Sequence, residues 1–304
     1  MKNSQNQIKT FWKIPDAQQE KLLSLIETEQ KELSDTLQSV LDQFGNTEMK
    51  GYLPKQKIER LYLAIRRWEQ DGYDEGEMRL WMNDLKNRRR IRGEEAFFMF
   101  LFASMVDYNR AVAKRSLPFL TASAIAAYNH SYKMAHAVTG KGKRQEINQN
   151  FVKSSLDGTL PSGGDFYSGL ENDAHYRARQ VQEQAISNLI QKKPLDMNSP
   201  EFVRIMNAQK HWQLRRTHAS VAGGYAGYYD MVTSFMVHTA VAQAYKDAQV
   251  KEYRFIAVID DVTTTTCKGL NGQTFRMSDM KMGINFPPTY PPPHPCRSIT
   301  EPIK

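Results

Sequence analysis

The sequence predicts a mainly α protein, with a multi-helix body, a small C-terminal β-hairpin and a proline-rich loop. Apolar residues recur at spacings of three, four and seven through most of the first 250 residues, as they do on one face of a helix. A β-type run then follows at 253–259, and Asn271-Gly272 is typical of a hairpin turn. Six prolines within 286–295 indicate an extended loop, because proline has no backbone N–H to donate.

Successive helices account for the N-terminal half in this prediction. Pro15 and Pro54 are expected to open helices, because proline suits the first turn. Gly45 is expected to stop the first helix, and Pro118 to end a long apolar one. The five predicted helices cover about residues 16–44, 55–68, 78–85, 94–116 and 121–137.

Glycine-rich segments in the middle of the chain indicate a boundary. Residues 140–144 read Gly-Lys-Gly-Lys-Arg, and 157–165 hold three glycines and a proline. We therefore predict an N-terminal helical region at 1–140, a loop or linker at 141–165 and a C-terminal domain at 166–304. That domain is expected to hold two or three more helices before the hairpin, with a break near 194–200.

Composition and charge narrow the classes of protein. No run of about 18 apolar residues suggests a membrane span, and the N-terminus lacks the features of a signal peptide. Two cysteines in 304 residues argue against a secreted disulfide framework, so we expect synthesis and assembly in a cytoplasm. The net charge of +8 favours an anionic partner, either nucleic acid or an acidic protein surface.

The last fifty residues carry the most specific motif. It combines an Asp–Thr–Cys–x–x–Leu–x–Gly element with a terminal His-Pro-Cys-Arg element. This pairing resembles the signature of the phage head morphogenesis family, the minor head proteins similar to the F protein of phage Mu. The resemblance covers about a third of the chain and extends upstream of the motif to the helix that includes His238 and to residues 250–259. The residues that carry it are Asp260, Asp261, Cys267, Gly272, His294, Cys296 and Arg297.

The resemblance implies a structural protein of the virion and not an enzyme. Family members are present in few copies in the head interior near the portal, after assembly in the host cytoplasm. A role in procapsid assembly or DNA delivery is implied, with the portal protein as partner and with contacts to scaffold and capsid proteins. No cofactor and no membrane contact are expected.

Two departures from the family pattern leave the chemistry of the motif open. Many members have cysteines where Thr264 and Ser298 stand here. One interpretation keeps a zinc site with Cys267, His294 and Cys296 as ligands, completed by Asp260 or Asp261. A second is a late Cys267–Cys296 disulfide. We favour a third, in which both cysteines are buried thiols.

The other motif residues have structural roles in every interpretation. Asp260 or Asp261 can accept hydrogen bonds from backbone amides two or three residues on. Gly272 supplies the positive φ of a turn. Arg297 can pair with a carboxylate as a bidentate clasp.

Two basic clusters are candidates for non-specific contact with double-stranded DNA. The stronger candidate comprises Lys86, Arg88, Arg89, Arg90 and Arg92, at the end of a helix that carries Trp81. The second comprises Lys141, Lys143 and Arg144, on the glycine loop. The alternative for both is a solvated surface, since cations stabilise helix C-termini without any ligand.

Other functional classes have weaker support. The histidines show no metal-binding spacing, and Ser234 is expected to be an ordinary cap or surface residue. A zinc-dependent nuclease would need a general base that the motif does not offer. An ADP-ribosylating toxin would be expected to have a further domain after His-Pro-Cys-Arg, where only six residues follow Ser298. A stand-alone, non-specific DNA-binding accessory protein is the remaining alternative.

Overall fold

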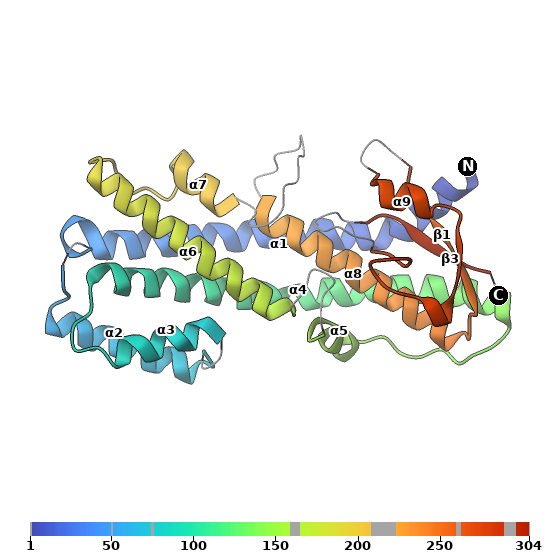
Figure 1. The fold of residues 1–304 in the computed structure, drawn as a ribbon, viewed down its shortest axis with the longest axis horizontal. Helices are drawn as coiled ribbons and strands as arrows, with labels where there is room; N and C mark the ends of the chain where they lie inside the picture. Colours follow the sequence, from blue (N-terminus) through green and yellow to red (C-terminus); the bar gives the residue numbers. More distant parts are fainter. Residues whose placement is uncertain are drawn as a thin grey trace. The chain divides into compact units, whose positions relative to one another are not determined.

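The computed structural model describes residues 2–49, 51–73, 76–158, 165–207, 223–259, 263–288 and 296–303. These residues form nine α-helices and a three-stranded antiparallel sheet near the C-terminus (Figure 1). The prediction of a mainly α fold with a small β tail is confirmed. None of the described helices is long and apolar enough to span a membrane.

The elements follow one another in this order. The helices of the first half are α1 (Lys2–Glu48), α2 (Lys55–Gln70), α3 (Gly76–Lys86) and α4 (Gly93–Thr139). Those of the second half are α5 (Gln149–Leu156), α6 (Phe166–Ile190), α7 (Pro200–Asn207), α8 (Gly223–Asp247) and α9 (Thr265–Leu270). The strands are β1 (Glu252–Ile256), β2 (Thr274–Arg276) and β3 (Ile299–Pro302).

The chain divides into two compact units. Unit 1 comprises Met1–Leu25, Arg115–Phe166 and His211–Lys304, and unit 2 comprises Ile26–Lys114 and Tyr167–Lys210. Both units are discontinuous in sequence, because α1 and α4 each contribute residues to both. The predicted regions 1–140 and 166–304 therefore each supply parts of both units.

Two prolines lie inside helices, where they were expected to mark helix ends. Pro15 lies within α1, which begins at Lys2, and Pro118 lies within α4, which continues to Thr139. An internal proline removes one backbone hydrogen bond and costs about 3 kcal/mol. Here the residues around each proline are buried on the helix face, including Trp12 and Leu120, and this burial offsets the cost.

Helix α5 lies inside the segment predicted as a loop or linker. Asn148 caps it, since its side-chain carbonyl accepts hydrogen bonds from the backbone N–H groups of Asn150 and Phe151. Val152 and Leu156 are fully buried on its inner face. Eight residues with two apolar anchors give too short a periodic pattern for sequence analysis to detect.

The sheet has strand order β2-β1-β3, and both pairings are antiparallel. β1 and β2 pair antiparallel, as predicted for the C-terminal hairpin, but α9 lies in the connection between them, so the Asn271-Gly272 turn is only part of that connection. Asn271 ends α9, and Gly272 follows it with a φ of +82°. β3 was not predicted, although it pairs with β1 over four residue pairs, from Tyr253↔Pro302 to Ile256↔Ile299. Residues 289–295 of the predicted proline-rich loop lie outside the described residues.

Candidate functional site

The two cysteines of the motif lie in one buried cluster of unit 1. Cys267 and Cys296 pack with Phe255 and Ala257, and Leu270 and Phe275 close the cluster from its edge. Both cysteines are buried, and they are not joined in a disulfide. The interpretation of both as buried thiols therefore agrees with their placement. We call this part of the molecule, with β1, β3, α9 and residues 296–298, the C-terminal clasp.

Local hydrogen bonds explain why the first element of the motif folds as it does. Thr264 is the N-cap of α9, and its hydroxyl accepts a hydrogen bond from the backbone N–H of Cys267 at 3.1 Å. At the other end, the Asn271 side chain accepts from the backbone N–H of Ala257 at 3.0 Å. The backbone N–H of Gly272 donates to the carbonyl of Phe255 at 2.8 Å. Thr264 thus has a capping role at the start of α9.

Arg297 ties the C-terminal clasp to the N-terminal helix. Its guanidinium forms an ion pair with Asp16 through one nitrogen, so a carboxylate partner exists as predicted, although the pairing is not bidentate. The same guanidinium lies over the ring of Trp12, 4.9 Å from its centroid. The indole N–H of Trp12 donates to the carbonyl of Arg297 at 3.0 Å.

Helix α8 holds the segment around Cys296 from the other side. Ser234 donates to the carbonyl of Cys296 at 3.0 Å, and Nε2 of His238 lies 3.5 Å from the same oxygen. Ser234 is buried, so its prediction as a cap or surface residue is wrong. His238 is only 1% exposed, and burial lowers its pKa to about 3, so the imidazole is neutral. Neither role was predicted from the sequence, where the only signal was two polar residues four apart on an apolar helix.

Three motif residues that bear on a metal site are not placed. Asp260, Asp261 and His294 lie outside the described residues. Within the described part of the chain, no group of three or more His, Cys, Asp or Glu residues could hold a metal ion. Zinc binding at Cys267, His294 and Cys296 stays a prediction.

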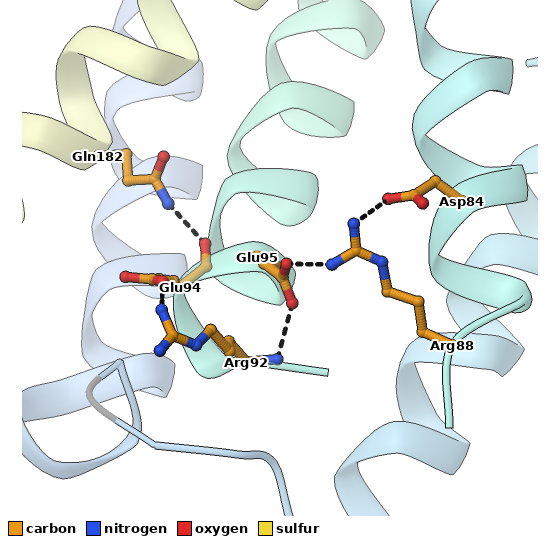
Figure 2. Close-up of polar contacts among 6 residues, drawn as sticks. All are labelled: Asp84, Arg88, Arg92, Glu94, Glu95 and Gln182. Carbon is orange, nitrogen blue, oxygen red and sulfur yellow. Dashed lines mark hydrogen bonds and ion pairs between the residues drawn. The ribbon is translucent and has the colours of Figure 1, made fainter. Parts of the chain in front are cut away.

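The first basic cluster lies in unit 2, where carboxylates engage most of its charge. Figure 2 shows Arg88 between Asp84, at 2.7 Å, and Glu95, with Arg92 paired to Glu94 at 2.8 Å. Lys86 pairs with Glu69 of α2 at 2.5 Å. Three of the five positive charges are therefore paired, with four carboxylates between them.

The two remaining arginines of that cluster differ in their surroundings. Arg90 lies 5.6 Å from the centroid of the Tyr52 ring. Arg89 is exposed and has no recorded ion-pair partner among the described residues. Little positive charge is left over for phosphates, and the cluster acts first as a connection between α3 and the start of α4.

The start of α4 depends directly on this network. Glu95 accepts a hydrogen bond from the backbone N–H of Arg92, the residue before the helix, at 2.8 Å. This is the acidic half of a capping box, and Glu94 and Glu95 also suit the positive end of the helix dipole. Backbone bonds from Leu53 to Ile91 and from Gly93 to Gly51 fix the same segment.

The second basic cluster has a different environment, in unit 1. Residues 141–145 run back along the C-terminal half of α4 and are tied to it at three points. Nδ1 of His136 lies 3.0 Å from the carbonyl of Lys141, Arg144 donates to the side chain of Asn129 at 2.6 Å, and the backbone of Gln145 donates to the Tyr128 hydroxyl at 2.7 Å. The segment therefore has a defined conformation although it is not helical.

Contacts with α8 complete this arrangement. Tyr128 donates to the carboxylate of Asp247 at 2.6 Å. Gly142, with a φ of +89°, lies so close to the carbonyl of Asp247 that a Cβ would collide with it. The rings of Tyr128, Tyr132 and His136 form a stacked row along α4 beside the segment.

The cations of this segment stay available to a ligand. Lys141, Lys143 and Arg144 are exposed, and among the described residues no ion pair with a carboxylate is recorded for any of them. Arg144 bonds only a neutral amide, so its charge is not compensated there. Of the two predicted clusters, this one presents the larger uncompensated charge. We call residues 141–144 the basic loop.

Comparisons with family models, with curated proteins and with solved structures found no match for this chain.

Proposed function

We propose that this chain is a minor head protein of a tailed bacteriophage, which binds the portal and contacts DNA without sequence preference. The observation that carries the proposal is the folding of its terminal motif. The two elements that resemble the head morphogenesis signature are far apart in sequence, yet Cys267 and Cys296 share one buried cluster. The two motif elements therefore pack together, and in doing so they hold the C-terminal end of the chain in the fold.

A clasp of this kind supports a structural role. The motif residues that are placed contact one another, the N-terminal helix and α8. Their side chains are engaged in packing, capping and ion pairing, which leaves the helical body to present surface to partners. A net charge of +8 favours association with an acidic partner, and this is the charge we expect of a portal ring.

Co-expression with the portal protein of the same phage tests the proposal. We expect the two proteins to co-elute in size exclusion at low salt, and the chain to be found in purified heads in few copies. Absence from the heads together with no co-elution would overturn it, and would leave a stand-alone DNA-binding protein as the better hypothesis.

We place the DNA contact at the basic loop. Its three cations are exposed on a segment that α4 and α8 hold in place, so little conformational entropy is lost when phosphates bind. Three of the five cations of the first cluster are already paired with carboxylates: Lys86 with Glu69, and Arg88 and Arg92 as Figure 2 shows. This reverses the ranking that the sequence suggested.

Two triple variants with the same loss of charge test this placement. Lys141→Ala/Lys143→Ala/Arg144→Ala should weaken binding to a duplex of mixed sequence and reduce the salt dependence, by about 0.9 in slope per lost phosphate contact. Lys86→Ala/Arg89→Ala/Arg90→Ala spares the two arginines that hold α4 and should change binding little. Equal losses in a salt titration would show that overall charge, and not the basic loop, determines binding.

A further inference from the structure

Unit 2 contains an apolar pocket that the proposed function leaves unassigned. It lies where α1, α2 and α4 meet, and Phe44, Leu61, Ala96 and Phe100 form its apolar lining. Its cavity volume is about 60 Å³. Small-molecule sites span about 300–1,000 Å³, so a cavity of this size suits one apolar side chain and not a nucleotide or cofactor.

The side chains that line the pocket pack against other core residues, which hold them in place, so the pocket is preformed. The rings of Phe44 and Phe100 lie 5.6 Å apart, and Trp68 contacts Phe100 edge-on at 5.3 Å. Leu61 and Ala96 are almost completely buried. A preformed apolar pocket binds with little loss of side-chain entropy.

Positive charge gathers at the mouth of the pocket. Lys57 and Arg60, three residues apart on α2, both line it. Helix α2 carries five basic residues and two acidic ones, and its first turn holds no acidic residue that would offset the positive end of the helix dipole. An anionic group beside the pocket is therefore favoured.

We propose that this pocket receives a bulky apolar side chain of an acidic protein segment, with carboxylates of that segment meeting Lys57 and Arg60. An apolar anchor surrounded by charge pairs is the usual arrangement at the centre of a protein interface. The choice of a protein partner rests on the proposed function, while the apolar and cationic lining is independent of it.

The probe is a fluorescein-labelled nine-residue peptide with a central phenylalanine flanked by glutamates, measured by fluorescence polarisation. Replacement of its phenylalanine by alanine, or of its glutamates by lysines, should weaken binding at least about tenfold. On the protein, Lys57→Glu/Arg60→Glu should do the same. Lys55→Glu/Arg66→Glu is the matched control, because it makes the same charge change on the same helix away from the pocket.

A second variant tests the cavity without changing charge. Gln43 lines the mouth and is exposed, so Gln43→Trp should fill the opening without disturbing the core and should weaken peptide binding. Equal effects of the two charge-reversal variants, or unchanged binding after Gln43→Trp or after the peptide loses its phenylalanine, would overturn the proposal. So would displacement of the peptide by dodecanoate at lower concentration than by unlabelled peptide, which would indicate a site for amphiphilic acids.

The portal experiment separates this proposal from the proposed function. Peptide binding that depends on the pocket, without portal co-elution, supports the pocket and contradicts the proposed function. Portal co-elution that Lys57→Glu/Arg60→Glu and Gln43→Trp leave unchanged keeps the proposed function and overturns the pocket as the docking site.

Discussion

Two buried polar side chains of unit 1, Ser234 and His238, lie against a backbone carbonyl that would otherwise be unsatisfied. The backbone carbonyl of Cys296 lies in a buried environment, where an unsatisfied acceptor costs about 1–3 kcal/mol. Ser234 satisfies it, and His238 lies at the limit of hydrogen-bond distance from the same oxygen. Both residues project from one face of α8, since they are four residues apart.

We predict that His238 makes the protein less stable in mild acid. Its pKa is lowered from an ordinary 6.5 to about 3 because burial disfavours the charged ring. Between these values the unfolded chain binds a proton that the folded chain does not, so the free energy of unfolding falls as pH falls below about 6.5. The contribution is at most about 1.4 kcal/mol per pH unit.

Urea unfolding of the parent and of His238→Gln at several pH values between 5 and 8 measures this contribution. Burial also lowers the pKa of the half-buried His130, but that residue is common to both proteins, so the difference in slope isolates His238. The difference in stability should be constant near pH 8 and should shrink toward pH 5. Parallel curves over the whole range would contradict the prediction.

At the scale of an element, the start of α4 depends on one carboxylate more than on its neighbour. Glu95 accepts from the Arg92 backbone N–H and pairs with Arg88, whereas the side chain of Glu94 pairs with Arg92 at the surface. We expect Glu95→Ala to cost about 1–2 kcal/mol of stability, the range for loss of a helix cap, and Glu94→Ala to cost less than about 1 kcal/mol. Chemical denaturation of both variants is the measurement, and equal losses would show that charge alone matters at this helix end.

The spacing of apolar residues correctly predicted the helices whose buried face follows a regular helical pattern. α2 and α3 lie where the spacing of Leu61, Ile65 and Trp68, and of Met78, Met82 and Leu85, placed them. The prediction was wrong at Pro15 and Pro118, where burial on the helix face outweighs a local signal that normally ends a helix. β3 has only four residues, and it becomes a strand because β1 pairs with it.

The candidate site, like the fold, was predictable from the sequence only in part. The motif spacing indicated that Cys267 and Cys296 belong together, and they share one cluster. Sequence alone could not rank the two basic clusters, because ranking depends on which carboxylates fold against them. Asp84 and Glu94 are close in sequence to the arginines they pair with (Figure 2), but Glu69 is 17 residues from Lys86, and only the packing of α2 against α3 brings it to the first cluster.

At the scale of the whole molecule, the two ends of the sequence meet within unit 1. Asp16 and Trp12 of α1 contact Arg297, which lies 281 residues from Asp16. Contacts of such long range form only when most of the chain is ordered, because closing a long loop costs entropy before the contact forms. The C-terminal clasp therefore reports on the integrity of unit 1 as a whole.

The two proposed binding features belong to different compact units, and this leads to the last prediction. The basic loop is part of unit 1, and the pocket with Lys57 and Arg60 is part of unit 2. Substitutions that share no partners act independently, so effects on the two activities should be additive. Lys141→Ala/Lys143→Ala/Arg144→Ala should lose DNA binding and keep peptide binding, and Gln43→Trp, which changes no charge, should do the reverse.

The combined variant should lose both activities to the same extent as the separate variants. The measurements are a salt titration with duplex DNA and peptide polarisation, each on the four proteins of the cycle. A variant of one feature that impairs the other activity would show that DNA and the acidic segment compete for one basic surface. In that event net charge, and not two dedicated features, would determine what this protein binds.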